Sequence, residues 1–361
     1  MSNHPDGRAP TYGAAAPITP GSPFETDIAA QPAALRALAN SDTLTSLPTI
    51  DLATFDRIIL TGMGASHYSA LPAWRRLVAM GCPAWWLSTS ELLDSPQLLT
   101  RRSLLWVTSQ SGRSGEIVAL LDGLGAGLAR PGLIVGVTND AGSLLANSSD
   151  VLLDIRAGEE STVSTKSYLN SLAANHLLLT HMTSSGTDTA LKAVLTAADE
   201  TEVASVSLSP VKAIASRILQ PDSPRLALIG AADQAASALV GALVIKEAAK
   251  LPAEGFVGGE FRHGPLELAG AGLTALVFTG PAASPGLSQL IRDLRETGSS
   301  AVEIGRSPGT GGERISTPAT SELSQTMADA KVAQLLSVEL ARARALVPGE
   351  FRFGQKVTSL A

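Results

Sequence analysis

Short, continuous apolar runs recur along the chain, and each ends at small or polar residues that precede a helix-like stretch. In the first half these runs are Ile58–Leu60, Leu104–Thr108, Leu133–Thr138 and Val151–Ile155. In the second half they are Leu226–Ile229, Leu273–Phe278 and Ala301–Gly305. Runs of this kind that alternate with helices are typical of strands buried on both faces of a parallel sheet. The pattern predicts an α/β fold with two tandem doubly wound domains, each a parallel sheet flanked by helices.

Apolar residues at helical spacing mark the segments between these runs. Ile28, Leu35 and Leu38 predict one or two short helices, because Pro32 limits where a single helix can continue. Further helices are predicted up to residue 80, over 115–128, from about residue 164, and between about 185 and 221. The last stretch joins the two halves. We therefore expect one domain over residues 23–200 and a second over 201–361, which ends in a C-terminal tail.

The first 22 residues differ from the rest of the chain. They are rich in Pro, Gly, Ala and Ser and show no period, which predicts a disordered leader over residues 1–22. They also lack the apolar core of a secretory signal. The apolar runs elsewhere are far shorter than the roughly 20 residues that a membrane helix needs. We expect a protein without a membrane partner.

Composition narrows the class further. The 361 residues are 45% hydrophobic, which is ample material for two cores. Lys and Arg number 27 against 33 Asp and Glu, a net charge of -6 with no basic block, which argues against a general nucleic-acid binder. The single cysteine, Cys82, rules out an internal disulfide framework and a cysteine-based zinc cluster. It also fits a reducing compartment, so we expect a cytoplasmic protein.

Two glycine- and serine-rich turns follow the first two apolar runs. They are Gly62-Met63-Gly64-Ala65-Ser66 and Ser109-Gln110-Ser111-Gly112-Arg113-Ser114. The carboxyl ends of parallel strands face one crevice, where hydroxyls and helix-start N–H groups can surround a phosphate without net positive charge. Taken singly, each turn is better explained as a helix cap and tight turn. A dinucleotide site is not supported, because His67 stands where the third glycine of that motif belongs.

The second half supplies an acid and an imidazole. Glu247 follows Lys246 in an Ala-rich segment, and His263 comes 16 residues later. A carboxylate and an imidazole can divide the proton transfers of an aldose–ketose rearrangement. The same residues also fit a solvated helix face and a structural loop histidine, so position alone does not assign them.

Several segments together resemble the tandem SIS (sugar isomerase) family from roughly residue 24 to residue 361. Within that family the chain is most similar to the isomerase part of glucosamine-6-phosphate synthase and to stand-alone SIS-type glucosamine-6-phosphate deaminases and fructosamine-6-phosphate deglycases. The segments are GMGASHYSAL, VTSQSGRSGEIVALL, RAGEESTVSTKSYLNSLAA, GALVIKEAAKLPAEGF, GGEFRHGPLEL and FGQKVTSLA. Their order and spacing support both expected domains.

The resemblance implies a role for each matching residue. The sugar phosphate would contact Gly64, Ala65, Ser66, Ser109, Gln110, Ser111, Ser114, Val163 and Ser164. Glu247 would move a proton between C1 and C2, and His263 would assist ring opening from the neighbouring subunit of a homodimer. Lys356 would enter the site from the tail and either form a Schiff base with the open-chain carbonyl or polarise it. No metal or redox cofactor is implied.

Five departures from the synthases stand out. Val244 replaces a lysine three residues before the glutamate, and Arg113 replaces an acid, as in stand-alone deaminases. The loop before Thr165 is about one residue shorter. The second-half turn, Gly230-Ala231-Ala232-Asp233, is degraded, so we expect no second phosphate site there. The chain begins Met1-Ser2 and lacks the N-terminal cysteine of a glutaminase domain, so glutamine is not expected to supply nitrogen.

The leading hypothesis is an amino-sugar phosphate deaminase/isomerase that converts glucosamine 6-phosphate, or a close relative, to fructose 6-phosphate and ammonia. The first alternative is a deglycase that cleaves a fructosyl-amine 6-phosphate. The second is a sugar-phosphate sensor that binds without turnover. For the enzyme, Glu247 is expected in a partly apolar environment that raises its pKa, because a base that removes a proton from carbon works best that way.

Overall fold

The computed structural model describes residues 21–44, 47–127, 130–183, 186–203, 208–222, 224–280, 284–306 and 309–358. The predicted leader lies outside the described residues except for Gly21 and Ser22. Ser22 caps the first helix: its hydroxyl accepts from the Glu25 N–H at 3.4 Å, and the Glu25 carboxylate accepts from the Ser22 N–H at 3.1 Å. This reciprocal capping box fixes where ordered helix begins.

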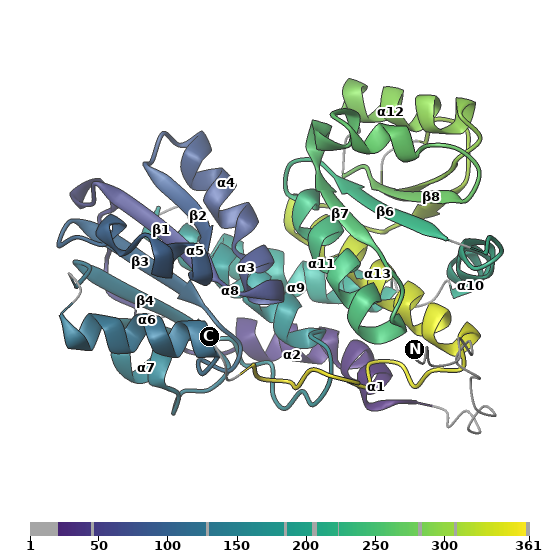
Figure 1. The fold of residues 1–361 in the computed structure, drawn as a ribbon. Helices are drawn as coiled ribbons and strands as arrows, with labels where there is room; N and C mark the ends of the chain where they lie inside the picture. The colour runs from purple at the N-terminus through teal and green to yellow at the C-terminus, as the bar shows by residue number, and fades with distance from the viewer. Residues whose placement is uncertain are drawn as a thin grey trace, which may run out of the picture.

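The structure confirms an α/β fold with two parallel five-stranded sheets, which Figure 1 shows in two lobes. The first sheet has the order β2-β1-β3-β4-β5 and the second β10-β9-β8-β6-β7, so both share one topology. The first contains β1 Arg57–Gly62, β2 Ala84–Ser88, β3 Ser103–Thr108, β4 Leu133–Thr138 and β5 Val151–Asp154. The second contains β6 Arg225–Gly230, β7 Glu254–Val257, β8 Leu273–Phe278, β9 Ser300–Gly305 and β10 Arg314–Ser316.

Helices flank both sheets and fill the space between the lobes. Those of the first half are α1 Pro23–Ala29, α2 Gln31–Ala39, α3 Gly64–Ser69, α4 Leu71–Ala79, α5 Thr89–Asp94, α6 Gly115–Ala126, α7 Leu144–Ser148 and α8 Lys166–Met182. Those that follow are α9 Thr187–Val203, α10 Leu208–Ile218, α11 Gln234–Ala249, α12 Pro285–Glu296 and α13 Glu322–Ala343. Short 3-10 turns are η1 Leu52–Thr54, η2 Pro96–Leu98, η3 Gly258–Arg262 and η4 Pro265–Leu268. None of the helices described is long and apolar enough to cross a membrane.

The N-terminal segment forms two helices, as predicted. Pro32 lies in the first turn of α2, where its missing N–H costs no helical hydrogen bond. The strand predictions were less complete, because β2, β7 and β10 were not expected. All three are edge strands, and β2 and β7 expose part of their residues; the other edge strand, β5, was expected although its burial alternates.

One buried cluster joins the two lobes. It runs from β1, β3 and β4 through α2, α8 and α9 to side chains of α11 and α13 such as Val240, Val244 and Ala330. Figure 1 shows α8, α9 and α11 between the sheets. Because α11 packs into the same core as the first sheet, residues on its exposed face are held at a fixed position opposite that sheet's turns.

Candidate active site

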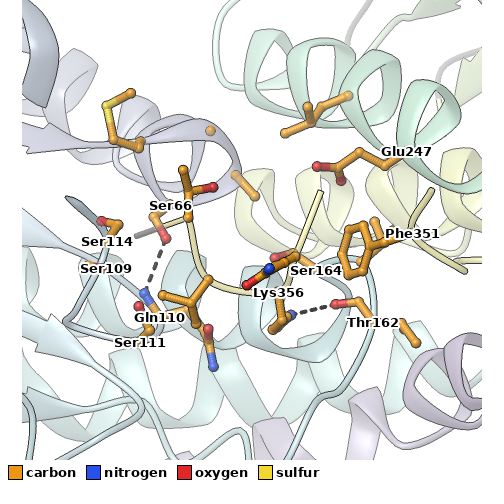
Figure 2. Close-up of a pocket in the computed structure, with 18 of the residues that line it drawn as sticks. Ser66, Ser109, Gln110, Ser111, Ser114, Thr162, Ser164, Glu247, Phe351 and Lys356 are labelled. Atoms are coloured by element: carbon orange, nitrogen blue, oxygen red, sulfur yellow. Dashed lines mark hydrogen bonds between the residues drawn. The ribbon is translucent and has the colours of Figure 1, made fainter. Parts of the chain in front are cut away.

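A cavity of about 290 Å³ lies where the first sheet, α11 and the C-terminal tail meet. Most residues in its lining come from four segments distant in the sequence (Figure 2). They are Met63, Gly64, Ala65 and Ser66; Ser109, Gln110, Ser111, Ser114 and Glu116; Thr162, Val163 and Ser164; and Phe351, Gln355, Lys356, Val357 and Thr358. Leu243 and Glu247 of α11 complete it. The structure therefore brings together all the predicted site residues except His263.

The two glycine- and serine-rich turns lie at the point where the strand order reverses. β1 pairs with β2 on one side and with β3 on the other, and each turn follows one of the two central strands. Ligands of open parallel sheets bind outside such a switch point. Close backbone approach is required here: a β-carbon on Gly62 would lie 2.6 Å from the Thr108 carbonyl oxygen. The topology therefore explains why both turns face one cavity.

Hydrogen bonds fix the hydroxyls of these turns. The Gln110 N–H donates to Ser66 Oγ at 3.3 Å, and the Gly112 N–H donates to Ser109 Oγ at 3.2 Å. Ser114 is the N-cap of α6, yet its side chain makes no capping bond. That hydroxyl lines the cavity and is available to a ligand at a helix N-terminus.

Arg113 does not face the cavity. Its guanidinium is about half exposed and pairs with Asp140 at 2.8 Å, while also donating to the Gly142 carbonyl at 3.0 Å. The arginine that distinguishes this turn from the synthase motif therefore braces the neighbouring loop. An anion in the cavity would be held by hydroxyls and N–H groups, as the sequence suggested.

Glu247 enters the cavity from the opposite wall. It lies near the end of α11, one turn after Leu243, which also lines the cavity. Burial raises the pKa of Glu247 above its ordinary value, and the nearby charges of Lys356, Lys250 and Lys246 offset only part of that effect. The direction of this shift agrees with the expectation for Glu247, and a carboxylate of raised pKa suits proton abstraction from carbon.

The C-terminal tail closes the remaining side. After α13 the chain returns to the first lobe, where the C-terminus lies in Figure 1. The Thr358 carbonyl accepts a hydrogen bond of 2.8 Å from the Gly115 N–H at the start of α6. Lys356 Nζ donates to Glu160 at 2.5 Å and to the Thr162 carbonyl at 2.7 Å. A lysine near a chain end is usually a frayed surface group, but this one is anchored.

His263 lies elsewhere. It follows η3 in the second lobe, its side chain is exposed, and it does not line the cavity of the same chain. The expectation that it acts on the site of a neighbouring subunit stays a prediction.

Several lining residues, and one residue that supports them, were not anticipated; three of these are polar residues that bear on the chemistry. Glu116 and Thr162 line the cavity, and the buried Glu160 holds Lys356 from behind. Glu160 lies in a loop without periodicity, so no local pattern separates it from the exposed Glu159 beside it. Only the tertiary contact with a residue 196 positions away reveals its role.

The charges of the lining limit the chemistry. Among its described members Lys356 is the sole Lys or Arg, and Glu116 and Glu247 are acids. Within the described part of the chain, no three His, Cys, Asp or Glu side chains are grouped to hold a metal ion. The site combines a polar cradle at one end with a buried carboxylate at the other, which is an arrangement for holding a remote anion while moving protons.

Comparison with known proteins adds the family. The SIS domain matches residues 51–181 and 220–344. A glutamine–fructose-6-phosphate aminotransferase of Pyrococcus horikoshii is 33% identical over 223 residues, which are 60% of this chain and 36% of that protein. The protein of the same name from Mycobacterium tuberculosis is 28% identical over 323 residues, or 81% of this chain and 49% of that protein. The chain thus spans about half or less of these curated relatives.

Solved structures agree on the fold. The C-terminal domain of glucosamine-fructose-6-phosphate aminotransferase from Francisella tularensis superposes with a TM-score of 0.78 at 19% identity, over 91% of this chain and 98% of that one. A tagatose-6-phosphate ketose/aldose isomerase from Escherichia coli gives 0.76 at 21%, over 93% and 96%. A glucosamine-6-phosphate deaminase from Thermotoga maritima gives 0.73 at 20%, over 93% and 99%.

Proposed function

The chain belongs to the SIS domain family, and from this premise we propose that it is an amino-sugar phosphate deaminase/isomerase. Its substrate is glucosamine 6-phosphate or a close relative, and its products are fructose 6-phosphate and ammonia. One observation carries the proposal: the hydroxyl-bearing turns of the first lobe and Glu247 of the second line a single cavity of about 290 Å³. Had they opened onto separate surfaces, only the fold would remain.

Binding begins at the phosphate. Ser66, Ser109, Ser111 and Ser114, with the N–H groups of their turns, hold the dianion at the start of α6. Leu243 and Glu247 then lie against the far carbons of the sugar. The phosphate does not react, so its binding energy serves to position C1 and C2 beside the carboxylate.

The chemistry is a series of three net proton transfers followed by hydrolysis. Ring opening moves a proton from the C1 hydroxyl to the ring oxygen and exposes the C1 aldehyde; His263 of a neighbouring subunit is the proposed shuttle. Glu247 then removes the C2 proton and returns it to C1, while one proton of the amino group passes to the aldehyde oxygen, which becomes a hydroxyl. The product is the C2 imine of fructose 6-phosphate. Water adds to this imine and ammonia leaves, which balances the reaction.

The relatives support this reaction class in part. One structural neighbour is described as a glucosamine-6-phosphate deaminase and another as a ketose/aldose isomerase. The curated relatives are aminotransferases of fructose 6-phosphate. Both descriptions involve phosphosugars in which C1 and C2 exchange oxidation level, and that shared chemistry is what we assign to this cavity.

Val244 gives no support to the deglycase alternative. Its side chain is shorter than the lysine of the synthases and could leave room for a bulky amine, but Val244 is 1% exposed and packs in the core between the lobes. It does not line the cavity, so a smaller residue there makes no space for a bulky amine. Because losing this support does not rule out the reaction, the substrate panel still includes fructosyl-amine phosphates.

The deciding experiment is a phosphosugar panel followed for ammonia and ketose release. Ammonia and fructose 6-phosphate from glucosamine 6-phosphate are expected, and the Glu247→Gln variant is expected to bind the substrate without releasing either. Amine release only from fructosyl-amine phosphates would replace the proposal with the deglycase. Binding without turnover of any member, in the wild-type chain, would favour the sensor. The proposed homodimer is checked in the same preparation by its mass in solution.

A further inference from the structure

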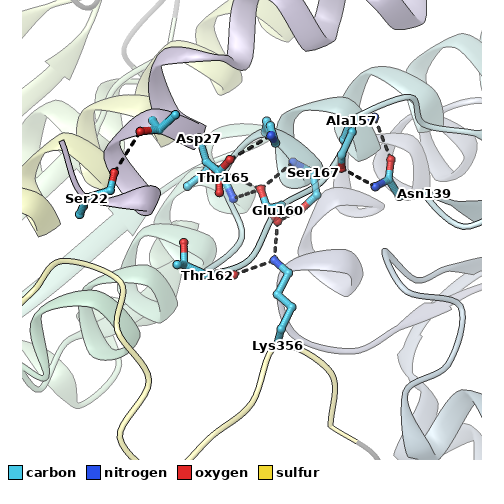
Figure 3. A network of polar contacts seen from close by, with 12 residues as sticks. Ser22, Asp27, Asn139, Ala157, Glu160, Thr162, Thr165, Ser167 and Lys356 are labelled. Atoms are coloured by element: carbon cyan, nitrogen blue, oxygen red, sulfur yellow. Dashed lines mark hydrogen bonds and ion pairs between the residues drawn. The ribbon is translucent and has the colours of Figure 1, made fainter.

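Glu160 is a buried carboxylate behind the tail (Figure 3). Its side chain is 0% exposed, yet it accepts hydrogen bonds from two neighbouring residues at the start of α8. Thr165 donates through its N–H and its hydroxyl, both at 2.9 Å, and Ser167 through its N–H at 3.1 Å and its hydroxyl. Lys356 Nζ completes the set at 2.5 Å. A buried charge is tolerated only with partners of this number and kind.

A second buried ion pair lies next to the Glu160–Lys356 pair. Lys166 lies between Thr165 and Ser167 and pairs with Asp27 of α1 at 2.9 Å, with both side chains about nine-tenths buried. The carboxylate of Glu160 lies beside the N-terminus of α8, where the helix dipole favours a negative group. Burial alone would raise the pKa of Glu160, but the Lys356 ammonium and the hydrogen bonds from Lys356 and Ser167 outweigh it and hold that pKa below its ordinary value. With the tail in place, these contacts therefore favour the ionised form of the carboxylate.

The contact between Lys356 and Glu160 is one of two polar contacts that hold the tail beside the cavity. Around the cavity, the segment 351–358 is tied to the first lobe by Lys356, through Glu160 and the Thr162 carbonyl, and by Thr358, through the Gly115 N–H. The neighbouring Phe353 is 99% exposed, so it contributes no packing to hold the tail down. Phe351 packs against the core at the start of the segment, but residues 352–355 are exposed, so the part of the tail beyond Phe351 depends on its polar contacts for its position.

We propose that Glu160 is a positioning residue for the reaction assigned above: it holds the Lys356 ammonium, and with it the C-terminal tail, against the cavity. Glu160 lies outside the cavity lining, so it acts through Lys356 and not on the substrate. The inference rests on the proposed function for its kinetic consequence. Its structural consequence, an ordered tail, does not require turnover.

The test compares Glu160→Gln with Glu159→Gln, a matched change at an exposed neighbour. In Glu160→Gln, amide hydrogen exchange over 351–358 is expected to accelerate at least tenfold, and KM for the phosphosugar to rise about tenfold, the effect of losing one charge-assisted hydrogen bond. Glu159→Gln is expected to change neither. Unaltered exchange of the tail in a folded Glu160→Gln protein would overturn the proposal.

A double-mutant cycle with Lys356→Met separates positioning from a merely structural role. If Glu160 acts through the lysine, Glu160→Gln should raise KM less than threefold in the Lys356→Met background. An equal increase in both backgrounds would overturn the proposal. Lys356→Met alone should accelerate tail exchange as much as Glu160→Gln, which keeps the test available should the glutamate variant fail to fold. If no phosphosugar is turned over, the proposed function fails, while the exchange data still decide the role of Glu160.

Discussion

The backbone N–H of Gln110 donates a hydrogen bond of 3.3 Å to the hydroxyl of Ser66. The two residues are 44 positions apart and belong to different turns, one after β1 and one after β3. This bond joins the turns into one polar surface at the switch point of the sheet. A ligand that binds one turn therefore also contacts the other. A substitution in one turn should alter the position of the other.

Replacing Ser66 with alanine should weaken phosphosugar binding. The variant loses a hydroxyl in the cavity lining and the acceptor of the Gln110 N–H, and a hydrogen bond to a charged ligand is worth about 1.5–3 kcal/mol. We expect the Kd for fructose 6-phosphate to rise about 10- to 100-fold by calorimetry. The control is Ser216→Ala on the exposed face of α10, which should leave the Kd unchanged. Equal affinity of Ser66→Ala and the wild-type chain would show that the phosphate binds elsewhere.

Glu247→Gln should separate binding from catalysis. Loss of a positioned general base costs about 10²- to 10⁴-fold in rate, so we expect kcat to fall in that range while substrate affinity changes little. Because burial raises the pKa of Glu247, the wild-type kcat/KM should decline toward acid pH with a midpoint above the ordinary value for glutamate. Stopped assays of ammonia release over a pH series measure both quantities. A variant that retains more than a tenth of the wild-type kcat would remove Glu247 from the reaction.

The same variant should be more stable than the wild-type chain. Burial disfavours the ionised carboxylate, so the folded pKa lies above the unfolded one and the penalty is present at neutral pH. It diminishes as pH falls below the folded pKa and is gone below the unfolded pKa, where the carboxyl is neutral in both states. Glu247→Gln should therefore unfold at a higher temperature than the wild type at pH 7.5, and the difference should shrink in acid. A lower melting temperature at pH 7.5 would contradict this.

The interior of the fold could be predicted from the sequence because it is encoded locally. β3 and β8 are buried at every position, so a run such as Leu104–Thr108 or Leu273–Phe278 is unbroken apolar or small. The edge strand β2 is different: Trp85 is 43% exposed, and Cys82 and Pro83 interrupt the segment before it. An edge position alone does not decide which strands are found, because β5 also lies at an edge and was expected from its run Val151–Ile155.

The residues of the candidate site also differ in how well the sequence predicts them. The serine-rich turns carry a signal in consecutive residues, and Glu247 and Lys356 were assigned by resemblance, so the structure found them where they were expected. Glu160 carries no such signal, because its role depends on a tail contact across 196 positions. The domain boundary near residue 200 also stays a proposal, since α9 packs against helices from both halves.

Two glycines offer a matched test of backbone geometry. Gly112 has a φ of +60° in the second turn, and a β-carbon there would collide with the Ser143 hydroxyl. Gly112→Ala should destabilise the fold by about 1–3 kcal/mol and weaken phosphosugar binding, since the turn must shift. Gly125 lies inside α6 with open space around it, and Gly125→Ala should stabilise the fold by about 0.5–1 kcal/mol. Urea titrations measure both. If both substitutions changed the free energy of unfolding in the same direction, helix propensity and not turn geometry would dominate.

Lys331 provides the clearest prediction on stability. It lies in α13, is 1% exposed, and its ammonium donates to the Thr201 carbonyl near the end of α9 at 2.8 Å. Burial lowers its pKa to about 8, an effect that the nearby charge of Glu202 only partly opposes. The folded chain therefore holds this proton less tightly than the unfolded chain does. By linkage the penalty is complete below about pH 8 and diminishes between pH 8 and the ordinary lysine value near 10.5.

Lys331→Met keeps the length of the side chain and removes the buried charge. At pH 7 we expect it to raise the free energy of unfolding by about 1–3 kcal/mol, because a buried ammonium held mainly by one carbonyl is costlier than an apolar group of similar shape. The gain should shrink as pH rises from 8 to 10, where the wild-type chain sheds the proton. Lys192→Met, on the exposed face of α9, is the control and should change the free energy of unfolding by less than about 0.5 kcal/mol at either pH. A loss of stability in Lys331→Met at pH 7 would mean that the bond to the end of α9 outweighs the cost of burying the charge.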